Sequence, residues 1–345
     1  MKVFYSNFYK NLNLFLKNYD KNNIFILIDK NVDSLWYNTV IQRVKILKDS
    51  KKFIIEATEK AKSIENEILV WQFLSENKAD RKSLIINIGG GITTDLGGFV
   101  AATFKRGCDF VNIPTTLLAM VDAAVGNKTG INFNGLKNEI GVFYFPKAVF
   151  IDVNFLRTLP QADFYDGYAE MLKYGFIYDK NLLNETYKLD LENIDFEKLT
   201  EIVKKNIKIK NYFIKTDKKD EKERHALNFG HTFAHGFEAF STQNVRKITH
   251  GTAVAWGMAG ELFLSHRKLG FDKNEFLKLH SFVKENYSKP DITCKNYEEI
   301  YKLLQHDKKN TSLEINFTLL SEIGKFHINQ KASQSDIYKA MEYMF

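Results

Sequence analysis

The chain has 345 residues, of which 44% are hydrophobic and 26% are charged. This composition is typical of a globular protein and excludes a fibrous or disordered chain, and the length favours two domains over one. The net charge of +7 comes from lysines spread along the chain, without the interleaved aromatic residues of an RNA-binding sheet, so we expect no nucleic-acid partner.

The cysteines and the apolar runs bear on the cellular compartment. Cys108 and Cys294 have no C-x-x-C spacing, and no apolar run is long enough to span a bilayer. The N-terminal segment also lacks the apolar core of a signal peptide. We therefore expect a cytoplasmic protein with no membrane partner.

The first half of the chain alternates short apolar runs with amphipathic helical patterns. Five runs predict buried strands, at residues 24–28, 53–55, 84–88, 110–113 and 148–151. Helical spacing at residues 59–77 and from residue 95 to about 104 separates some of them. This order predicts an open, largely parallel α/β sheet, in which ligands bind at the carboxyl ends of the strands. Residues 29–31 and 89–91 directly follow two strands, where a nucleotide would bind.

A glycine turn stands at one of these strand ends. The sequence GGGITTDLGG begins at Gly89 and includes Asp95. Backbone N–H groups and the helix dipole at such a turn can bind a pyrophosphate. The turn is not the G-x-G-x-x-G fingerprint, and glycine turns between strand and helix are common, so by itself it is weak evidence for a dinucleotide.

The segment at residues 113–141 predicts a ligand pocket. It gathers polar side chains among small residues and glycines: Thr115, Thr116, Asp122, Lys128, Asn132, Lys137 and Asn138. Glycine allows the backbone to approach a ligand closely, and lysine is a compact charge suited to phosphate. The alternative is a solvated, turn-rich connection.

The second half of the chain predicts a mostly α-helical domain. Helical periods cover residues 164–178, 196–215, 227–240 and 252–269, whereas only residues 314–319 and 325–328 have an extended pattern. We place the two domains at residues 1–158 and 159–345.

A polar stripe is predicted near the start of the third of these helical periods. Arg224, Asn228, His231 and His235 follow at intervals of four, three and four, which on one helix places all four on one face. Apolar residues around them make a simple solvent-exposed face less favoured, so we expect the stripe to face a site.

Two histidines and one carboxylate would complete a zinc site. His250 precedes the next helical run, and Glu170 lies in YDGYAEMLKYG, three residues before Lys173. Catalytic zinc commonly has three such protein ligands and one open position. The alternatives are that each histidine is structural and that Glu170 and Lys173 only pair with each other.

With these segments, the chain resembles the 3-dehydroquinate synthase family nearly from end to end. The matching motifs are GGGITTDLGGFVAATFKRG (89–107), IPTTLLAMVDAAVGNKTGIN with LKNEIG (113–141), FLRTLP (155–160), GYAEMLKYG (167–175), RHALNFGHTFAHGFE (224–238), HGTAVAWGM (250–258) and DKKN (307–310). The resemblance implies a Rossmann-like, NAD-binding α/β domain at the N-terminus, a mostly α-helical, metal-binding domain at the C-terminus, and a homodimer.

The resemblance also implies the roles of individual residues. The zinc (or cobalt) ligands would be Glu170, His231 and His250. The NAD-binding residues would be Asp29, Asn31, Glu59, Lys62, Gly89, Gly90, Gly91, Asp95, Thr115, Thr116, Lys137, Phe155 and Thr158. The substrate, a phosphorylated sugar acid, would meet Arg106, Asp122, Lys128, Asn138, Lys173, Lys210, Arg224, Asn228, His235 and Lys309, with Arg106 reaching across the dimer. The catalytic group would comprise Lys128, Lys173, Asp220, Arg224 and His235.

The implied reaction is a lyase step of the shikimate pathway, which leads to the aromatic amino acids. It converts 3-deoxy-D-arabino-heptulosonate 7-phosphate to 3-dehydroquinate and phosphate. Its stages are transient oxidation by NAD, phosphate elimination, re-reduction and an intramolecular aldol closure. Retention of Lys128, Asn138, Arg224, Asn228 and His235 favours a carboxylate-bearing substrate. Another sugar phosphate cyclase and a metal-dependent polyol dehydrogenase of similar fold are the alternatives.

The chain departs from the family pattern at one acidic position. The segment before Arg224 reads DKKDEKER, so the family's proton acceptor maps to Asp220, and Glu221 or Glu223 remains an alternative. In DKKN, either Lys308 or Lys309 would face the substrate.

Overall fold

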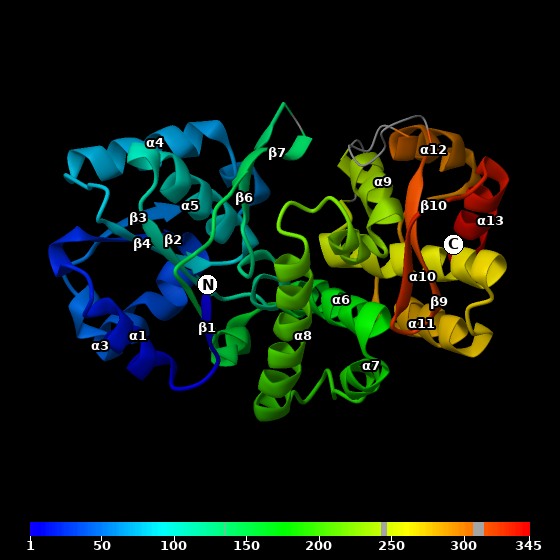
Figure 1. Ribbon diagram of the computed structural model, residues 1–345, viewed down its shortest axis with the longest axis horizontal. Helices are drawn as coiled ribbons and strands as arrows, with labels where there is room; N and C mark the ends of the chain where they lie inside the picture. Colours follow the sequence, from blue (N-terminus) through cyan, green and yellow to red (C-terminus); the bar gives the residue numbers. More distant parts are fainter. Residues whose placement is uncertain (135, 243–246, 306–313) are drawn as a thin grey trace. The chain divides into compact units, whose positions relative to one another are not determined.

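The computed structural model of the protein describes residues 1–134, 136–242, 247–305 and 314–345 (Figure 1). By its internal contacts the chain forms two compact units. The first comprises residues 1–164 and 195–207, and the second comprises residues 165–194 and 208–345. The boundary that we place after residue 158 stays a prediction. Among the residues described, no helix is both long enough and apolar enough to cross a membrane.

A six-stranded parallel sheet forms the centre of the first unit. Its order is β1 (Lys2–Phe4), β8 (Ala148–Phe150), β5 (Asp109–Pro114), β4 (Leu84–Gly89), β2 (Ile24–Asp29) and β3 (Lys51–Ile55). All five strands that the apolar runs predict are present, and every neighbouring pair is parallel. This confirms the predicted α/β class of the first unit.

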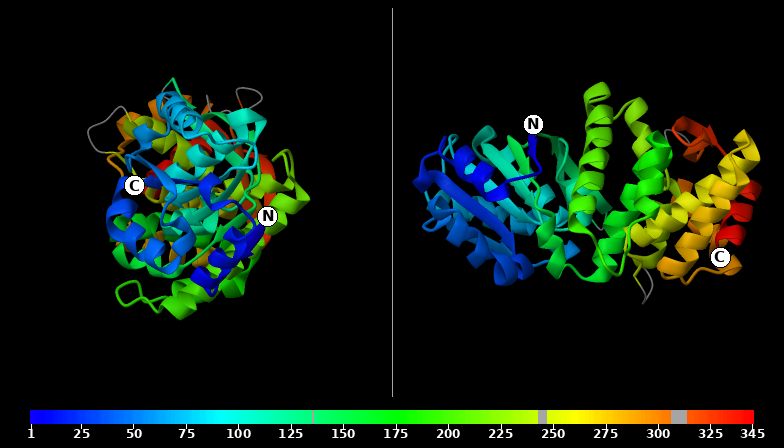
Figure 2. Two further views of the ribbon diagram at one scale, coloured as in Figure 1. Left: turned by 90° about the vertical axis from the view of Figure 1, so that its left-hand side faces the viewer. Right: turned by 90° about the horizontal axis from the view of Figure 1, so that it is seen from below.

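Helices cover both faces of this sheet, which explains why its central strands are continuous apolar runs. Helices α4 (Ile64–Glu76) and α5 (Gly91–Thr103) lie on one side, and α1 (Phe8–Leu16) lies on the other (Figures 1 and 2). The short helices α2 (Lys30–Val32) and α3 (Asn38–Arg43) follow β2. Every residue of β2 and β4 is buried. A strand that is buried on both faces has apolar residues at successive positions, so its sequence does not alternate between polar and apolar residues.

The order of the strands reverses between β2 and β4. The chain passes from β2 outward to β3 and then returns to β4 on the other side of β2. In open α/β sheets the crevice at such a reversal, at the carboxyl ends of the strands, is the usual ligand site. Asp29 ends β2 and Gly89 ends β4, so the predicted nucleotide residues stand at this reversal.

An antiparallel hairpin, absent from our sequence-based expectations, overlaps the end of the segment of residues 113–141. Its strands are β6 (Lys128–Phe133) and β7 (Leu136–Phe143), and Gly130 pairs with Gly141. A Cβ on Gly130 would lie 2.5 Å from the carbonyl oxygen of Ile140, so the two backbones approach too closely for side chains. These glycines interrupt the apolar alternation by which a strand is recognised.

The second unit is mostly helical, as predicted. Its helices are α6 (Gln161–Tyr178), α7 (Lys180–Tyr187), α8 (Phe196–Thr216), α9 (His231–Thr242), α10 (His250–Leu269), α11 (Lys273–Asn286), α12 (Tyr297–Gln305) and α13 (Gln334–Met344), of which α6 and α8 begin in residues of the first unit. Strands β9 (Asn316–Glu322) and β10 (Lys325–Lys331) form an antiparallel pair. Most of α10 is buried, and the N–H of Leu320 in β9 donates to Oγ of Ser265 in α10 at 2.9 Å. Helix α10 is therefore the central element of this unit.

Candidate metal and cofactor sites

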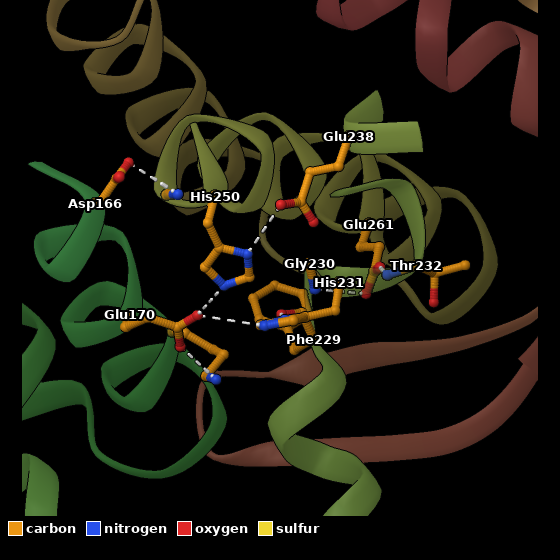
Figure 3. Close-up of polar contacts among 11 residues, drawn as sticks. Asp166, Glu170, Phe229, Gly230, His231, Thr232, Glu238, His250 and Glu261 are labelled. Atoms are coloured by element: carbon orange, nitrogen blue, oxygen red, sulfur yellow. Dashed lines mark hydrogen bonds and ion pairs between the residues drawn. The ribbon is translucent and has the colours of Figure 1, made fainter. Parts of the chain in front are cut away.

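Glu170, His231 and His250 converge in the second unit from three different helices, α6, α9 and α10 (Figure 3). Oε1 of Glu170 lies 3.3 Å from Nε2 of His231 and 3.3 Å from Nε2 of His250. One ligand atom from each residue lies within 4.8 Å of the other two. One carboxylate oxygen and two imidazole nitrogens are a donor set that zinc takes in catalytic sites. The residues present therefore fit a divalent metal.

Buried charges fix the protonation of the carboxylate. The side chain of Glu170 is 0% exposed and that of Lys173 is 2% exposed, and Nζ of Lys173 forms an ion pair with Oε2 of Glu170. Burial raises the pKa of Glu170, but the charge of Lys173 and the interactions with His231 and His250 outweigh burial and hold this pKa well below its usual range. Glu170 is thus a carboxylate, the form that a metal ligand requires.

The two histidines have opposite pKa shifts. Burial and the charge of Lys173 lower the pKa of His231 to about 4, so its ring is neutral. Burial also disfavours the charged form of His250, but the charge of Glu238 and hydrogen bonds to Glu170 and Glu238 raise its pKa to about 10. Because a metal ligand must be deprotonated, a cation bound at this cluster would displace the proton of His250.

The outer nitrogen of each histidine also has a partner. Nδ1 of His250 lies 3.5 Å from Oε1 of Glu238, and Nδ1 of His231 lies 3.1 Å from the carbonyl oxygen of Phe229 (Figure 3). Such contacts orient the ring and direct Nε2 toward the metal position. Our sequence reading assigns no role to Glu238. Glu238 is seven residues after His231 and lies on the same face of α9, but this spacing alone does not distinguish a supporting carboxylate from an ordinary polar residue.

The polar stripe predicted on one helix is divided between two segments, so that prediction is wrong. Arg224 and Asn228 lie in the 3-10 helix η8 (Glu223–Asn228), whereas His231 and His235 lie in α9. Gly230 separates the two segments with a φ of +82°, and a Cβ there would lie 2.5 Å from Cγ of Met258. The chain turns at this glycine because only glycine fits the conformation and the space.

His235 keeps a place beside the metal cluster despite this turn. It lies one helical turn after His231, and the two rings meet edge to face with centroids 5.8 Å apart. The ring of His235 therefore lies next to the proposed metal ligands.

Asp217 organises the loop that leads to Arg224. Its carboxylate accepts the N–H groups of Glu221 at 3.1 Å, Lys222 at 2.6 Å and Arg224 at 3.3 Å. Burial raises the pKa of Asp217, but these N–H groups outweigh burial and lower it. Asp220 lies inside this loop with a φ of +61°. The loop places Asp220 and the buried Arg224 in a defined conformation.

Two lysines of the predicted substrate group belong to the same unit and are also buried. The side chain of Lys173 pairs with Glu170 on α6, and Lys210, in α8, is 7% exposed. Buried lysines are rare unless they are paired. Lys309 lies outside the described residues.

In the first unit, the carboxyl ends of β2, β4 and β5 bring together several predicted NAD residues. A Cβ on Gly89 would lie 2.6 Å from Oδ2 of Asp29 and 2.4 Å from Oγ1 of Thr93, so only glycine fits there. Burial raises the pKa of Asp29, and nearby backbone N–H groups offset part of this shift. The N–H of Thr115 donates to the carbonyl oxygen of Gly89 at 3.0 Å.

The same edge offers hydrogen-bonding groups to a nucleotide. Gly90 is the N-cap of α5, and no side chain caps this helix. The first N–H groups of a helix lack partners within the helix and favour an anion such as a pyrophosphate. Oγ1 of Thr115 is buried with no hydrogen-bond partner. These features fit a bound dinucleotide.

Lys62 is the centre of a second polar cluster in this unit. Nζ of Lys62, whose side chain is 5% exposed, pairs with Asp95 on α5 and with Oδ1 of Asn138 on β7. Nδ2 of Asn132 donates to Oε1 of Glu59 at 2.7 Å, and the N–H of Asn138 donates to Oδ1 of Asn132 at 2.9 Å. The structure thus joins predicted NAD residues and a predicted substrate residue. Asn132 connects Glu59 to Asn138, although the sequence predicts no specific role for Asn132.

The remaining predicted NAD residues differ in exposure. Asn31 follows β2 and is exposed, as is Lys137 in β7. Phe155, in the 3-10 helix η7 (Val153–Thr158), is buried against Trp36, with ring centroids 4.9 Å apart. Nε1 of Trp36 donates to Oγ1 of Thr158 at 2.8 Å. The side chain of Phe155 is thus part of the core, and its backbone N–H donates to the carbonyl oxygen of Asp152 at 3.2 Å.

The other predicted substrate residues of the first unit lie on three elements. Asp122 is on the π-helical turn η6 (Ala119–Ala123), and the exposed Lys128 begins β6. Arg106 is exposed, with a φ of +68°, in a turn where Lys105 also has a positive φ of 48°. Two successive left-handed residues that are not glycine are uncommon, so this turn holds Arg106 in an unusual backbone conformation.

Comparison with known proteins places this geometry in a family. A family model described as 3-dehydroquinate synthase N-terminal matches residues 52–166, and one described as 3-dehydroquinate synthase C-terminal matches residues 167–310. The chain belongs to the 3-dehydroquinate synthase family. A 3-dehydroquinate synthase from Parabacteroides distasonis is 42% identical over 325 residues, which cover 94% of this chain and 91% of that protein. The resemblance that the motifs indicate is confirmed.

Two solved structures have the same fold. One is a 2-epi-5-epi-valiolone synthase from Streptomyces hygroscopicus subsp. jinggangensis with NAD+ and Zn2+ bound, with a TM-score of 0.81, 24% identity and coverage of 93% of this chain and 91% of that chain. The other is a 2-deoxy-scyllo-inosose synthase with carbaglucose-6-phosphate, NAD+ and Co2+, with a TM-score of 0.83, 21% identity and coverage of 99% and 96%. At 24% and 21% identity, these similarities show only that this chain shares their fold. The predicted fold class is confirmed.

Proposed function

We propose that this protein is a phosphate-eliminating lyase that converts 3-deoxy-D-arabino-heptulosonate 7-phosphate to 3-dehydroquinate and phosphate. The observation that carries the proposal is the Glu170, His231 and His250 cluster, within a chain that matches both domains of the 3-dehydroquinate synthase family. The relative from Parabacteroides distasonis, at 42% identity, is named for this activity. This closeness favours dehydroquinate formation over the reactions of other sugar phosphate cyclases or polyol dehydrogenases.

The chain would hold its two cofactors in different units. Glu170, His231 and His250 would bind zinc or cobalt, and the edge at Asp29, Gly89 and Thr115 would bind NAD. A bound metal supplies Lewis-acid polarisation of a substrate hydroxyl, and NAD supplies a hydride acceptor that is regenerated within the turnover. NAD and zinc or cobalt, present in the related structures, fit this division.

Side chains of the second unit would orient the substrate. Lys173 and Arg224 are buried cations, and His235 lies next to the metal cluster. Cations suit the phosphate and carboxylate of a sugar acid phosphate, and holding a flexible substrate in one geometry contributes much of a catalytic effect. Asp220 would accept a proton from the substrate. The ion pair with Glu170 would hold the Lys173 ammonium group in place.

The Lys62 cluster would order the hairpin near the nucleotide edge. Lys62 joins Asp95 of α5 to Asn138 of β7, so a nucleotide that contacts either residue would also depend on the other. We further propose that the protein acts as a cytoplasmic homodimer in which Arg106 reaches the partner's site. The exposure of Arg106 and the two unbridged cysteines support these proposals.

The decisive experiment is phosphate release from 3-deoxy-D-arabino-heptulosonate 7-phosphate with zinc and catalytic NAD, with the organic product identified by mass and absorbance. We expect phosphate and 3-dehydroquinate in equal amounts without net NADH. A folded, zinc-loaded protein that releases no phosphate would refute the proposal. Net NADH formation from a polyol would instead indicate a dehydrogenase.

A histidine variant separates the metal site from the rest of the assay. His231→Ala is expected to lose both bound zinc and phosphate release. His327→Ala is the matched control, because His327 lies exposed on β10 and contacts Ser321. Unchanged zinc content in His231→Ala would remove His231 from the ligand set.

A further inference from the structure

Glu261 is a buried carboxylate that contacts the backbone on both sides of His231. Its Oε2 accepts the N–H of Gly230 at 2.9 Å, and its Oε1 accepts the N–H of Thr232 at 3.2 Å (Figure 3). Glu261 is 0% exposed, and both acceptor contacts are buried. Glu261 is separate from the cluster of Glu170, His231 and His250 and offers its carboxylate to the backbone of α9.

These N–H groups stand at the start of α9, where a helix lacks internal partners for its first donors. Such donors are usually satisfied by the side chain of the N-cap residue or by water. Gly230 has no side chain, and the site is buried. The cap therefore comes from another helix, α10, and its negative charge suits the positive end of the α9 dipole.

Helix α10 contacts the start of α9 at a second point. A Cβ on Gly257 would lie 2.0 Å from the carbonyl oxygen of Gly230, so the two backbones are in direct contact. Gly257 is four residues before Glu261, which places both on one face of α10. The start of α9 is thus held by a close backbone contact and by two hydrogen bonds from one face of α10.

The same helix carries His250 in its first turn. His250 and Glu261 are 11 residues apart, which is about 16 Å along a helix axis. One rigid element therefore provides one proposed metal ligand and also holds the backbone of another. The spacing between His231 and His250 therefore depends on the first turn of α10 and on its middle, where Glu261 lies.

We propose that Glu261 is a positioning residue for the metal centre, which fixes His231 by binding the N–H groups before and after it. This inference rests on the metal site of the proposed function. A carboxylate is required, because it offers one acceptor oxygen to each N–H. In Glu261→Gln the amide NH₂ would face one of the two donors, and that end of α9 would shift with His231.

The test measures zinc affinity in competition with a chelator, and the visible absorption of the Co²⁺-loaded protein. Changes in outer-sphere partners typically weaken metal affinity by about 10- to 100-fold, and we expect a loss of this size for Glu261→Gln. We also expect its cobalt bands to shift, because the position of His231 changes. Asp272→Asn is the matched control, since Asp272 caps α11 by accepting the N–H groups of Asn274 and Glu275. This control should leave affinity and spectrum unchanged.

A second variant covers the case in which Glu261→Gln does not fold. Glu261→Asp keeps the charge but shortens the side chain by one methylene, so it cannot reach both N–H groups, and it should also weaken zinc binding. Wild-type affinity and spectrum in a folded Gln or Asp variant would overturn the inference alone. If the wild-type protein itself binds no zinc, the proposed metal site fails, and the inference fails with it.

Discussion

Glu238 and His250 form a carboxylate and histidine pair next to the proposed metal ligands. Oε1 of Glu238 lies 3.5 Å from Nδ1 of His250, and the opposite ring nitrogen, Nε2, lies 3.3 Å from Glu170. Glu238 is 7% exposed. The ring of His250 is therefore held between two buried carboxylates, one of which would share the metal.

Glu238→Gln is expected to weaken zinc binding by about 10- to 100-fold, because Nδ1 of His250 loses a charged partner. Chelator competition would measure this loss, and activity at saturating zinc should recover in part. Glu342→Gln, at an exposed position on α13, is the control. Equal zinc affinity in Glu238→Gln and the control would show that Glu238 does not support the ligand.

Gly251→Ala is expected to disturb the other side of His250. A Cβ on Gly251 would lie 2.1 Å from Cα of Asp166, whose Oδ1 accepts the N–H of Gly251 at 2.9 Å. Because that contact is with backbone, α6 or α10 must move. We expect a destabilisation of about 1–3 kcal/mol and weaker zinc binding.

Gly260→Ala is the matched change for Gly251→Ala, because it makes the same substitution in the same helix. Its new Cβ would meet the flexible end of Met344 at 2.7 Å and Cδ2 of Phe233 at 3.0 Å, which are side-chain atoms and not backbone, so we expect a smaller loss of stability. Thermal unfolding and zinc titration would compare the two variants. Similar melting temperatures and zinc affinities in both would contradict the close approach of α6 to α10.

Asp217→Asn tests the loop that leads to Arg224. Oδ2 of Asp217 accepts the N–H groups of Lys222 and Arg224, and an amide at this position would present a donor to some of the loop's N–H groups. We expect kcat/KM for the sugar acid phosphate to fall roughly tenfold, while the KM for NAD is unchanged. Steady-state kinetics with each ligand varied would measure both. An equal change in both KM values would indicate a general loss of structure rather than a local effect.

The sheet could be predicted from the sequence because its strands are continuous apolar runs between helical patterns. The β6 and β7 hairpin could not, because Gly130 and Gly141 remove side chains where the two backbones touch. The stripe from Arg224 to His235 was misplaced for a related reason. The turn at Gly230 depends on Met258 of another helix, a contact that local spacing does not reveal.

The residues of the candidate site also fall into those that the sequence could predict and those that it could not. The family motifs indicated Glu170, His231 and His250, which the structure brings together. Glu238 and Glu261 escaped prediction because each supports a histidine through contacts between helices. A buried glutamate in an apolar helix has no sequence signal that distinguishes a support from an ordinary polar residue. Only the contacts between helices show that these two glutamates support metal ligands.

Glu67 provides a prediction about pH in the first unit. It is 0% exposed on α4, and its Oε1 accepts the hydroxyl of Thr103 at 3.0 Å. Burial raises the pKa of Glu67 from 4.5 to about 8, although the Thr103 hydrogen bond opposes part of this shift. The folded protein therefore binds a proton that the unfolded chain has already released between these two pH values.

The sign of the pH effect follows from this difference. Below pH 4.5 Glu67 is neutral in both states, and as the pH rises toward about 8 folding requires proton uptake, so the free energy of unfolding falls. The loss should be up to about 1.4 kcal/mol for each pH unit in that window. Glu67→Gln removes the titration, so its stability relative to wild type should rise from pH 5 to pH 8.

Urea unfolding of both proteins at several pH values would measure this trend. Glu65→Gln is the control on the same helix, because burial does not raise the pKa of Glu65 above its usual range. A constant difference between Glu67→Gln and wild type from pH 5 to pH 8 would mean that Glu67 ionises normally in the folded protein. Because the comparison uses the change with pH, any constant cost of burying the amide cancels.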